Sequence, residues 1–372
     1  MVPNGWLHKQ IGEIASIQVG RDLVEDKYSE ISTTEYKYPV YSNTVENKGL
    51  YGFYNFPEYS GNAITIVGRG VGLGKAFARS PGESFGAIGR LLVLTPKNNS
   101  FDVIFFANYI NFALRIHNES GGIPQLPGAS LSKYFVMLPP LAEQQKIAQI
   151  LSTWDKAIAV TEQLLANSQQ QKKALMQQLL TGKKRLLDEN GARFEGEWEE
   201  FSLGNIAKVY QPKTISQSQL SFDGYPVYGA NGIIGYYCDF NHELEQIAVT
   251  CRGSTCGVVN WTMPKSWITG NAMVINVDNN SAISKKFLFY VLSNADLKYL
   301  ITGSGQPQIT GDIKNHVVHL ASFKEQKVIA QVLTIADQEI EVLQRKLDCL
   351  QQEKKALMQQ LLTGKRRVKV AP

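Results

Sequence analysis

The chain of 372 residues is longer than one ordinary folded core and fits two to four compact units. Hydrophobic residues make up 44% of it and charged residues 19%, a balance typical of a folded protein rather than a disordered one. The net charge of +5 permits a polyanionic partner without requiring one. No apolar run is long enough to cross a membrane and the first residues do not resemble a signal peptide, so we expect a cytoplasmic protein.

The cysteines form no disulfide framework, as expected for reduced thiols. They are Cys238, Cys251, Cys256 and Cys349, all in the second half of the chain. The pair Cys251 and Cys256 and the pair His316 and His319 have spacings that occur in zinc sites. The first half has no counterpart at any of these positions, so we predict no metal site.

The chain contains two copies of one unit. Residues 143–183 align with 325–365 without a gap, and 24 of the 41 pairs are identical. The similarity extends upstream more weakly, for example through Tyr-Pro-Val-Tyr at 38–41 and again at 225–228. Each copy is therefore a divergent globular domain followed by a nearly invariant tail, which suggests a common scaffold that carries two different readers.

Both tails are predicted to be long helices that pair. Apolar residues recur at alternating steps of four and three over five heptads, a pattern typical of a coiled coil. The interface predicted for the first helix is Ile147, Leu151, Trp154, Ile158, Leu165, Leu175 and Leu179. The interface predicted for the second is Ile329, Leu333, Ile340, Leu343, Leu347, Leu350, Leu357 and Leu361. We favour an antiparallel pair, which makes the two copies equivalent about a pseudo-twofold axis. A helical hairpin or an oligomerisation coil is the alternative.

The ends of the tails carry helix boundary signals. Ser322 and Glu325 form a capping-box pattern, and the proline pair at 139–140 stops the first helix from extending backward. Gly182 and Gly364 follow the last periodic residues, where a left-handed conformation is favoured.

The globular parts are predicted to be rich in strands, because short β-branched and aromatic segments alternate with glycine. Strands are expected at 38–41, 51–54, 63–67 and 91–94, and at 225–228, 234–237, 247–251 and 272–277. Helices are expected at 103–115 and 284–299. The class is α+β, with two β-rich domains joined by two long helices.

A glycine-rich segment at 68–75 resembles a phosphate-cradling loop. It lacks the first glycine of that motif, where Arg69 stands, and its Ser or Thr, where Ala76 stands. We favour a turn that presents Arg69, Lys75 and, in the second copy, Arg252 to a DNA backbone or base edge. A purely structural turn and a nucleotide site are the alternatives.

A second motif precedes the last strand of each domain. Pro-Gln at 124–125 matches Pro-Gln at 307–308. The amides of Gln125 and Gln308 could donate hydrogen bonds to adenine or to phosphates, and a structural turn is an equally good interpretation.

No catalytic motif stands out. The chain lacks the Asn/Asp-Pro-Pro-Tyr/Phe segment of enzymes that methylate base amino groups, and it lacks a glycine-rich fingerprint for S-adenosylmethionine. Glu325 and Lys327 have the spacing of a nuclease Glu-x-Lys motif, but they lie on a predicted helix without an acidic partner nearby. We interpret them as part of a solvated face, and we expect neither enzymatic activity nor a cofactor in this chain.

Three segments together point to a known family. They are Pro-Asn-Gly-Trp at 3–6 followed by Ile-Gly-Glu-Ile at 11–14, the junction Leu-Pro-Pro-Leu-Ala-Glu-Gln-Gln-Lys-Ile at 138–147, and the helix end at 172–183 with its repeat. In this order they resemble the specificity subunits of type I restriction–modification systems, and the resemblance covers essentially the whole chain. The second junction, at 319–326, lacks the double proline of the first.

The resemblance implies target-recognition domains at 1–139 and 188–321 and conserved helical regions, paired as a coiled coil, at 140–187 and 322–372. Such subunits bind double-stranded DNA and two modification subunits and recruit restriction subunits, and S-adenosylmethionine and ATP belong to those partners. This chain would read two half-sites separated by a spacer whose length the helices fix. A non-catalytic adaptor with two protein-binding β domains and a self-contained enzyme are the competing interpretations.

Overall fold

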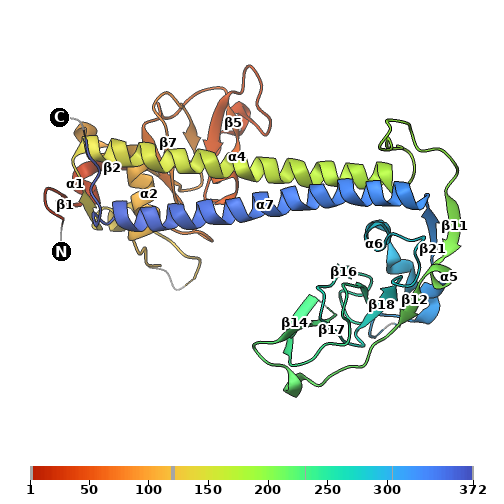
Figure 1. Cartoon of the computed structure of the whole chain (residues 1–372). Coiled ribbons are helices and arrows are strands. Elements are labelled where there is room, and N and C mark those ends of the chain that lie inside the picture. Colours follow the sequence, from red (N-terminus) through yellow and green to blue (C-terminus); the bar gives the residue numbers. More distant parts are fainter. Residues whose placement is uncertain (1–2, 119–121, 231, 304, 371–372) are drawn as a thin grey trace. The chain divides into compact units, whose positions relative to one another are not determined.

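The computed structural model describes residues 3–118, 122–230, 232–303 and 305–370. The chain divides into two compact units (Figure 1). The first unit comprises Met1–Thr161 with Lys346–Pro372, and the second comprises Glu162–Arg345. Each unit therefore combines one globular domain with part of each long helix.

The first domain is built on two sheets and one strand pair. The first sheet is antiparallel with the order β2–β9–β6–β7, made of β2 (Ala15–Val19), β9 (Leu92–Pro96), β6 (Ala63–Ile66) and β7 (Ala76–Arg79). The second has the order β3–β5–β4–β8, made of β3 (Tyr28–Ser29), β5 (Leu50–Tyr54), β4 (Tyr38–Tyr41) and β8 (Gly86–Ala87), with β4 and β8 parallel. The pair is β1 (Leu7–Gln10) with β10 (Phe135–Leu138). The helices are α1 (Ile11–Ile14), α2 (Val103–Ala113) and α3 (Gly128–Leu131).

The second domain repeats this topology. Its antiparallel sheet has the equivalent order β12–β18–β15–β16, made of β12 (Lys208–Tyr210), β18 (Ala272–Asn276), β15 (Ile247–Thr250) and β16 (Val259–Trp261). The other sheet is β14 (Gly232–Tyr237), β13 (Tyr225–Gly229) and β17 (Trp267–Ile268), with β13 and β17 parallel. The strand pairs are β11 (Glu199–Ser202) with β21 (Val317–Leu320), and β19 (Ile301–Thr302) with β20 (Gln308–Ile309). The helices are α5 (Leu203–Ile206) and α6 (Lys285–Asn294).

The predicted strands are confirmed, each within two residues of its expected bounds. The helix predicted at 284–299 is too long. It ends at Asn294, and a separate 3-10 turn follows at Leu297–Leu300. The break has a local cause, because the side chain of Asp296 accepts a hydrogen bond from the backbone N–H of Lys298 at 3.1 Å and so begins a new turn.

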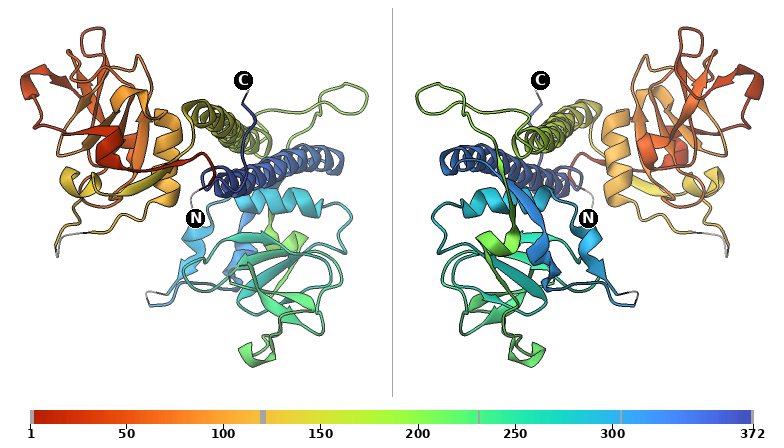
Figure 2. Two further views of the ribbon diagram at one scale, coloured as in Figure 1. Left: turned by 90° about the vertical axis from the view of Figure 1, so that its left-hand side faces the viewer. Right: turned by 90° about the vertical axis from the view of Figure 1, so that its right-hand side faces the viewer.

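The central strand of each main sheet is buried on both faces. In β6, Ile64 and Ile66 pack with Phe105 of α2 on one face, while Ala63 packs with Tyr41 of the neighbouring sheet on the other. In the second unit α6 lies between the sheet and α7 (Figure 2), where its Phe287 joins the same core as β15. A strand buried on both faces cannot shift its register without exposing apolar side chains, so the loops at its ends are firmly positioned.

The two long helices are α4 (Leu141–Leu179) and α7 (Phe323–Leu361), each of 39 residues. Their bounds differ by 182 residues, the offset of the sequence repeat. Gly182 and Gly364 follow them with φ of +68° and +69°, as predicted for left-handed C-terminal residues. Among the residues that the structure describes, no helix combines the length and the apolar character that a membrane span requires.

The residues predicted for the helix interface are all buried or half-buried. Those near the helix ends also complete the domain cores. Ile147, Leu151 and Leu361 belong to the core of the first unit, and Leu179, Ile329 and Leu333 to that of the second. The apolar residues near the helix ends therefore pack against the globular domain of their unit, in addition to any packing between the two helices.

In the first unit, the carboxylate of Glu143 near the start of α4 is buried and accepts hydrogen bonds from the guanidinium of Arg367 at 2.6 and 2.7 Å. Twelve residues farther along α4, Asp155 pairs with Lys354 of α7. Residue numbers rise along α4 as they fall along the C-terminal segment, so these two stretches run antiparallel.

The second unit contains the equivalent pairs. Glu325 near the start of α7 accepts hydrogen bonds from Arg185 at 2.6 Å, and Asp337 pairs with Lys172 of α4 at 2.5 Å. Glu325 has no exposed surface, so the prediction that it and Lys327 form a solvated face is wrong for the glutamate. The predicted capping box is also only half formed. The N–H of Glu325 donates to Ser322 at 3.4 Å, but its carboxylate turns to Arg185 instead.

We expect Arg367→Ala to lower the free energy of unfolding of the first unit by about 2–3 kcal/mol, because it leaves the buried carboxylate of Glu143 without its cation. The cost is below that of a fully buried pair, since the side chain of Arg367 is 42% exposed. Urea unfolding followed by fluorescence measures the change. Arg366→Ala is the matched control, because Arg366 is exposed and bonds to Gln360 only through its backbone N–H. Equal losses in the two variants would contradict a role for the ion pair.

Candidate nucleic-acid interface

The glycine-rich segment of the first domain is a hairpin loop that joins β6 to β7. The N–H of Val67 donates to the carbonyl of Lys75 at 2.9 Å, which closes the loop. Gly70, Gly72 and Gly74 have φ between +83° and +89°, a conformation that favours glycine. The loop leads into a strand and not into a helix, so it lacks the helix N-terminus on which phosphate-cradling loops depend.

The two motifs that the sequence analysis identified separately lie side by side in the first domain. Arg69 and Gln125 form an antiparallel β-bridge. The N–H of Gly70 donates to Pro124 at 2.9 Å, and the N–H of Leu126 donates to Gly68 at 2.9 Å. We call residues 68–75 and 122–126 together the first loop pair.

The second domain has the same arrangement at equivalent positions. Arg252 and Gln308 form the bridge, and the N–H of Gly253 donates to Pro307 at 3.0 Å. Residues 251–257 and 305–309 are the second loop pair. In both domains an arginine and a glutamine, 56 residues apart in sequence, are thus held next to each other by backbone hydrogen bonds.

The side chains of the loop pairs are available to a ligand. Arg69, Arg252 and Gln308 are exposed, and Gln125 is half-buried. Arg69 and Gln125 line a cleft of about 360 Å³ together with Arg90. Lys75, which was predicted to act with them, is exposed but lines a separate cleft of about 470 Å³, together with residues of α2 such as Ile110 and Asn111.

Arg90 lies in the same cleft as Arg69, although the sequence did not identify it as a candidate site residue. It is exposed and has φ of +67°. A signal was present, because Gly89-Arg90 repeats the Gly-Arg order of residues 68–69. The proximity of the two arginines depends on the pairing of β6 with β9, which no local pattern reveals.

Each loop pair is also fastened to the turn that follows β4 or β13, but by different groups. In the first domain the N–H of Gly68 donates to the side-chain oxygen of Asn43 at 2.8 Å. In the second domain the backbone carbonyl of Ala230 accepts from the hydroxyls of Thr250 and Thr255 at 2.6 and 2.8 Å. Both loop pairs are therefore hydrogen-bonded to the turn after the equivalent strand, but the residues that form these hydrogen bonds differ between the domains.

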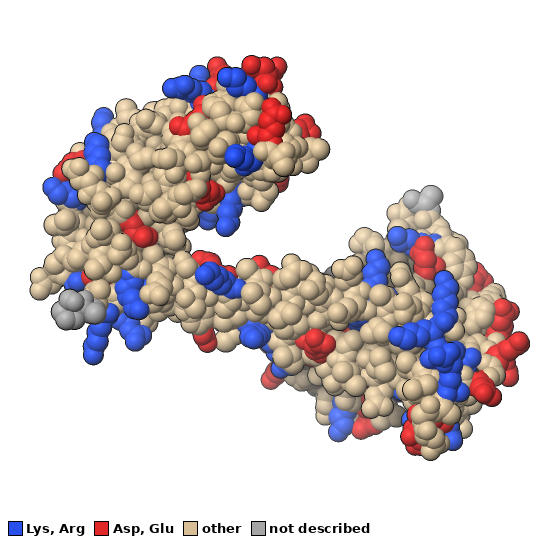
Figure 3. Space-filling model, turned by 90° about the horizontal axis from the view of Figure 1, so that it is seen from above, with Lys and Arg blue, Asp and Glu red and all other residues tan. Residues whose placement is uncertain are grey.

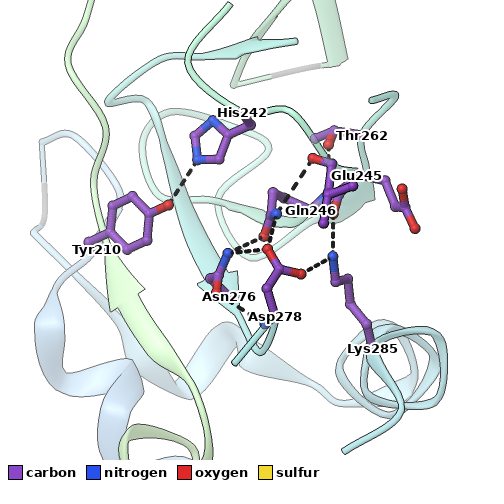
Figure 4. A network of polar contacts seen from close by, with 9 residues as sticks. Tyr210, His242, Glu245, Gln246, Thr262, Asn276, Asp278 and Lys285 are labelled. Carbon is purple, nitrogen blue, oxygen red and sulfur yellow. Dashed lines mark hydrogen bonds and ion pairs between the residues drawn. The ribbon is translucent and has the colours of Figure 1, made fainter. Parts of the chain in front are cut away.

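A polar network fixes the far end of β15, the strand that leads to Arg252 (Figure 4). Gln246, just before β15, donates to the carboxylate of Asp278 at 2.8 Å, which also pairs with Lys285 at the start of α6. Burial raises the pKa of Asp278, but the hydrogen bonds from Lys285 and Gln246 outweigh it, so this pKa lies below its ordinary value. The carboxylate therefore stays ionised at neutral pH and holds the strand and the helix together.

The same network region holds a neutral histidine. Burial lowers the pKa of His242 below its ordinary value of 6.5. Its Nδ1 lies 2.6 Å from the side-chain oxygen of Asn241, which already accepts from the N–H of Ile268, so Nδ1 carries the proton. Nε2 then accepts from the hydroxyl of Tyr210 at 2.9 Å (Figure 4). This is a structural contact between β12 and the loop before β15.

On the face that Figure 3 shows, lysine and arginine side chains lie among aspartate and glutamate side chains, with one group of adjacent basic side chains on the right. The described residues contain no group of three His, Cys, Asp or Glu side chains that could hold a metal ion. Cys251 is buried and accepts a hydrogen bond from Gln211 at 3.0 Å. What the geometry offers is two equivalent surfaces with arginine and glutamine, the side chains that pair with guanine and adenine edges.

The model of one protein family, described as the type I restriction modification DNA specificity domain, matches residues 3–167 and 195–352. The chain belongs to this family. The specificity subunit determines which DNA sequence a type I restriction–modification system recognises, so the two domains are target-recognition domains. Membership in this family decides against the adaptor interpretation.

Relatives of this specificity subunit cover it over most of its length. A putative type I specificity subunit of Mycoplasma pneumoniae is 27% identical over 337 residues, which cover 87% of each chain. The specificity subunit of the MjaVIII type I restriction enzyme of Methanocaldococcus jannaschii is 23% identical and covers 99% of this chain and 94% of its own. Among solved structures, the S subunit of a type I system from M. genitalium has a TM-score of 0.73 at 18% identity, covering 97% of this chain and 99% of that one. This last likeness concerns the fold.

We expect Arg69→Ala and Arg252→Ala each to weaken recognition of one half of the target only. If the arginine contacts a base, the loss is about 1–3 kcal/mol and is confined to one base pair. If it contacts a phosphate, the loss is uniform across sequences and the salt dependence falls by about one ion. Binding titrations of the assembled complex on duplexes with single base-pair changes, at two salt concentrations, measure both. Each variant serves as the control for the other, and unchanged binding by two folded variants would refute the assignment.

Proposed function

We propose that this specificity subunit reads a bipartite DNA target, one half-site with each domain. The observation that carries the proposal is the repetition of the loop pair, in which Arg69 with Gln125 and Arg252 with Gln308 occupy equivalent positions on equivalent sheets. The exposed residues around them differ between the domains, as expected of two readers for different sequences. Base contacts give specificity, and phosphate contacts set position.

The helices act as a ruler between the half-sites. In this proposal α4 and α7 form an antiparallel coiled coil through the predicted apolar stripes, and its length sets the nonspecific spacer. The equal length of the two helices supports this. So do the ion pairs, because in each unit they join stretches of α4 and α7 that run antiparallel. A helix of 39 residues is about 58 Å long at about 1.5 Å per residue, enough to separate two readers along a duplex.

The partners are double-stranded DNA, two modification subunits and the restriction subunits. The modification subunits supply S-adenosylmethionine and adenine methylation, and the restriction subunits supply ATP-dependent translocation and cleavage. The internal repeat supports two modification subunits, because two equivalent halves offer two equivalent surfaces. A solved chain with a TM-score of 0.53 and 16% identity comes from a study of complex assembly and conformational transition in a type I system, and its likeness to this chain concerns the fold.

The subunit itself contributes recognition and no chemistry. The absence of cofactor and methylation motifs in its sequence supports this part of the proposal. Calorimetry of the isolated full chain with S-adenosylmethionine should give no heat of binding, and the isolated chain should not methylate DNA, while the complex with modification subunits does both. Stoichiometric cofactor binding by the isolated chain would overturn it.

We expect the spacer to follow the length of the helices. Deleting one heptad from each, residues 162–168 and 344–350, shortens the ruler by about 10 Å and the spacer by roughly three base pairs. The charged partners Asp155, Lys172 and Lys354 lie outside both deletions, so the ion pairs can re-form.

The positions of methylated adenines in DNA treated with the reconstituted complex give the spacer directly. Glu162→Ala is the control, since it changes the surface of the same segment and not its length. A deletion variant that methylates DNA with the parental spacer would refute the ruler.

A further inference from the structure

The tips of the two loop pairs carry side chains of opposite character at equivalent positions. The backbone bonds set the register: after the bridge of Arg69 with Gln125 and the bond from Gly70 to Pro124, the next residues on the two segments are Val71 and Ile123. In the second domain the same count leads from Arg252 and Gln308 to Ser254 and Gln306. Val71 and Ser254 are 183 residues apart, as are Ile123 and Gln306, and 183 is the offset between the two copies in this part of the chain.

The apolar tip of the first domain is presented to solvent. Val71 is 94% exposed and Ile123 is 55% exposed. A single exposed apolar side chain is ordinary on a protein surface, but here two directly follow the hydrogen-bonded positions of one loop pair, beside an exposed arginine. Gly70 and Gly72, both with left-handed φ, flank Val71 and hold it outward from the hairpin. In the second domain Ser254 and Gln306 are exposed in the same place.

Packing does not account for the difference, because side chains with this exposure contribute little to a core. A ligand that meets the two tips would meet a hydrocarbon surface in one domain and hydrogen-bonding groups in the other. In the major groove, the base-edge group that favours a hydrocarbon surface is the C5-methyl of thymine. A hydroxyl and an amide instead suit the donors and acceptors of other base edges.

We propose that Val71 and Ile123 form an apolar reading tip that recognises the C5-methyl group of a thymine in the first half-site. This inference rests on the proposed function, in which each domain reads one half-site. Arg69 and Gln125, held beside the tip, supply the polar contacts to neighbouring bases or phosphates. Ser254 and Gln306 give the second domain a polar tip, so its half-site has no methyl contact at the equivalent position.

Replacement of thymine by deoxyuridine tests the proposal, because it removes the methyl and leaves the hydrogen-bonding edges unchanged. The probe is a duplex carrying the target found by mapping the adenines methylated by the reconstituted complex. Each thymine is replaced in turn, and the dissociation constant of the full complex is measured. We expect about a four-fold loss at one thymine of one half-site, the effect of withdrawing one methyl group from an apolar contact.

The exchanged tips provide the matched variants. The double variant Val71→Ser, Ile123→Gln should lose the deoxyuridine effect at that position while still binding the second half-site. The double variant Ser254→Val, Gln306→Ile should keep it. Both should fold, because each places in one loop pair the residues that the other already carries. Ile31→Ser changes another exposed apolar residue, 74% exposed and outside the loop pair, and should leave the deoxyuridine profile unchanged.

Three results would overturn the inference: a recognised half-site without any methyl-sensitive thymine, a methyl effect that persists in the Val71→Ser, Ile123→Gln variant, or an equal loss of affinity by that variant on all duplexes. Each of these leaves sequence-specific binding of both half-sites intact. Failure of the parent complex to discriminate between sequences in either half-site would instead refute the proposed function, so the two failures are distinguishable.

Discussion

The structure depends on two buried carboxylates at the starts of the long helices. Glu143 and Glu325 are almost entirely removed from solvent, and a buried carboxylate must have a cation close by. In each unit the cation is an arginine, Arg367 or Arg185, that follows the C-terminal end of a long helix. The hydrogen bonds to the glutamates raise the pKa of both arginines, so each arginine stays charged at any physiological pH. Since each pair joins the beginning of one helix to the end of the other, a change of length in one helix alone would disturb the register.

The repeat explains why the scaffold is preserved and the readers are not. The helix ends, the two glutamates and the two arginines recur at the same offset, because each takes part in an interaction whose partner lies in the other copy of the repeat. Loss of either arginine would leave a buried carboxylate unpaired. The domains face no such constraint beyond their cores. In the second domain, for example, Asp278 pairs with Lys285 and accepts from Gln246, and the described residues of the first domain form no equivalent ion pair.

Local patterns in the sequence predicted the strands, the long helices and their glycine ends, because these depend on residues close together in the chain. They did not predict contacts between distant segments. The bridge of Arg69 with Gln125 joins residues 56 positions apart and depends on the pairing of whole strands. Glu325 was misassigned for the same reason, because its partner Arg185 is 140 residues away. The repeat held the missing information, since Glu143 and Glu325, and likewise Arg185 and Arg367, are equivalent under its offset.

The loop pairs show how recognition can diverge on a fixed frame. Their geometry is set by backbone hydrogen bonds, from Gly70 to Pro124 and from Gly253 to Pro307, and by glycine at the positions with left-handed φ. None of these contacts uses the side chains at the tips. A residue there can be exchanged without loss of these hydrogen bonds or of core packing, which leaves its identity free to follow the DNA sequence that we propose it reads. In the proposed function, stability and specificity therefore depend on different atoms of the same loops.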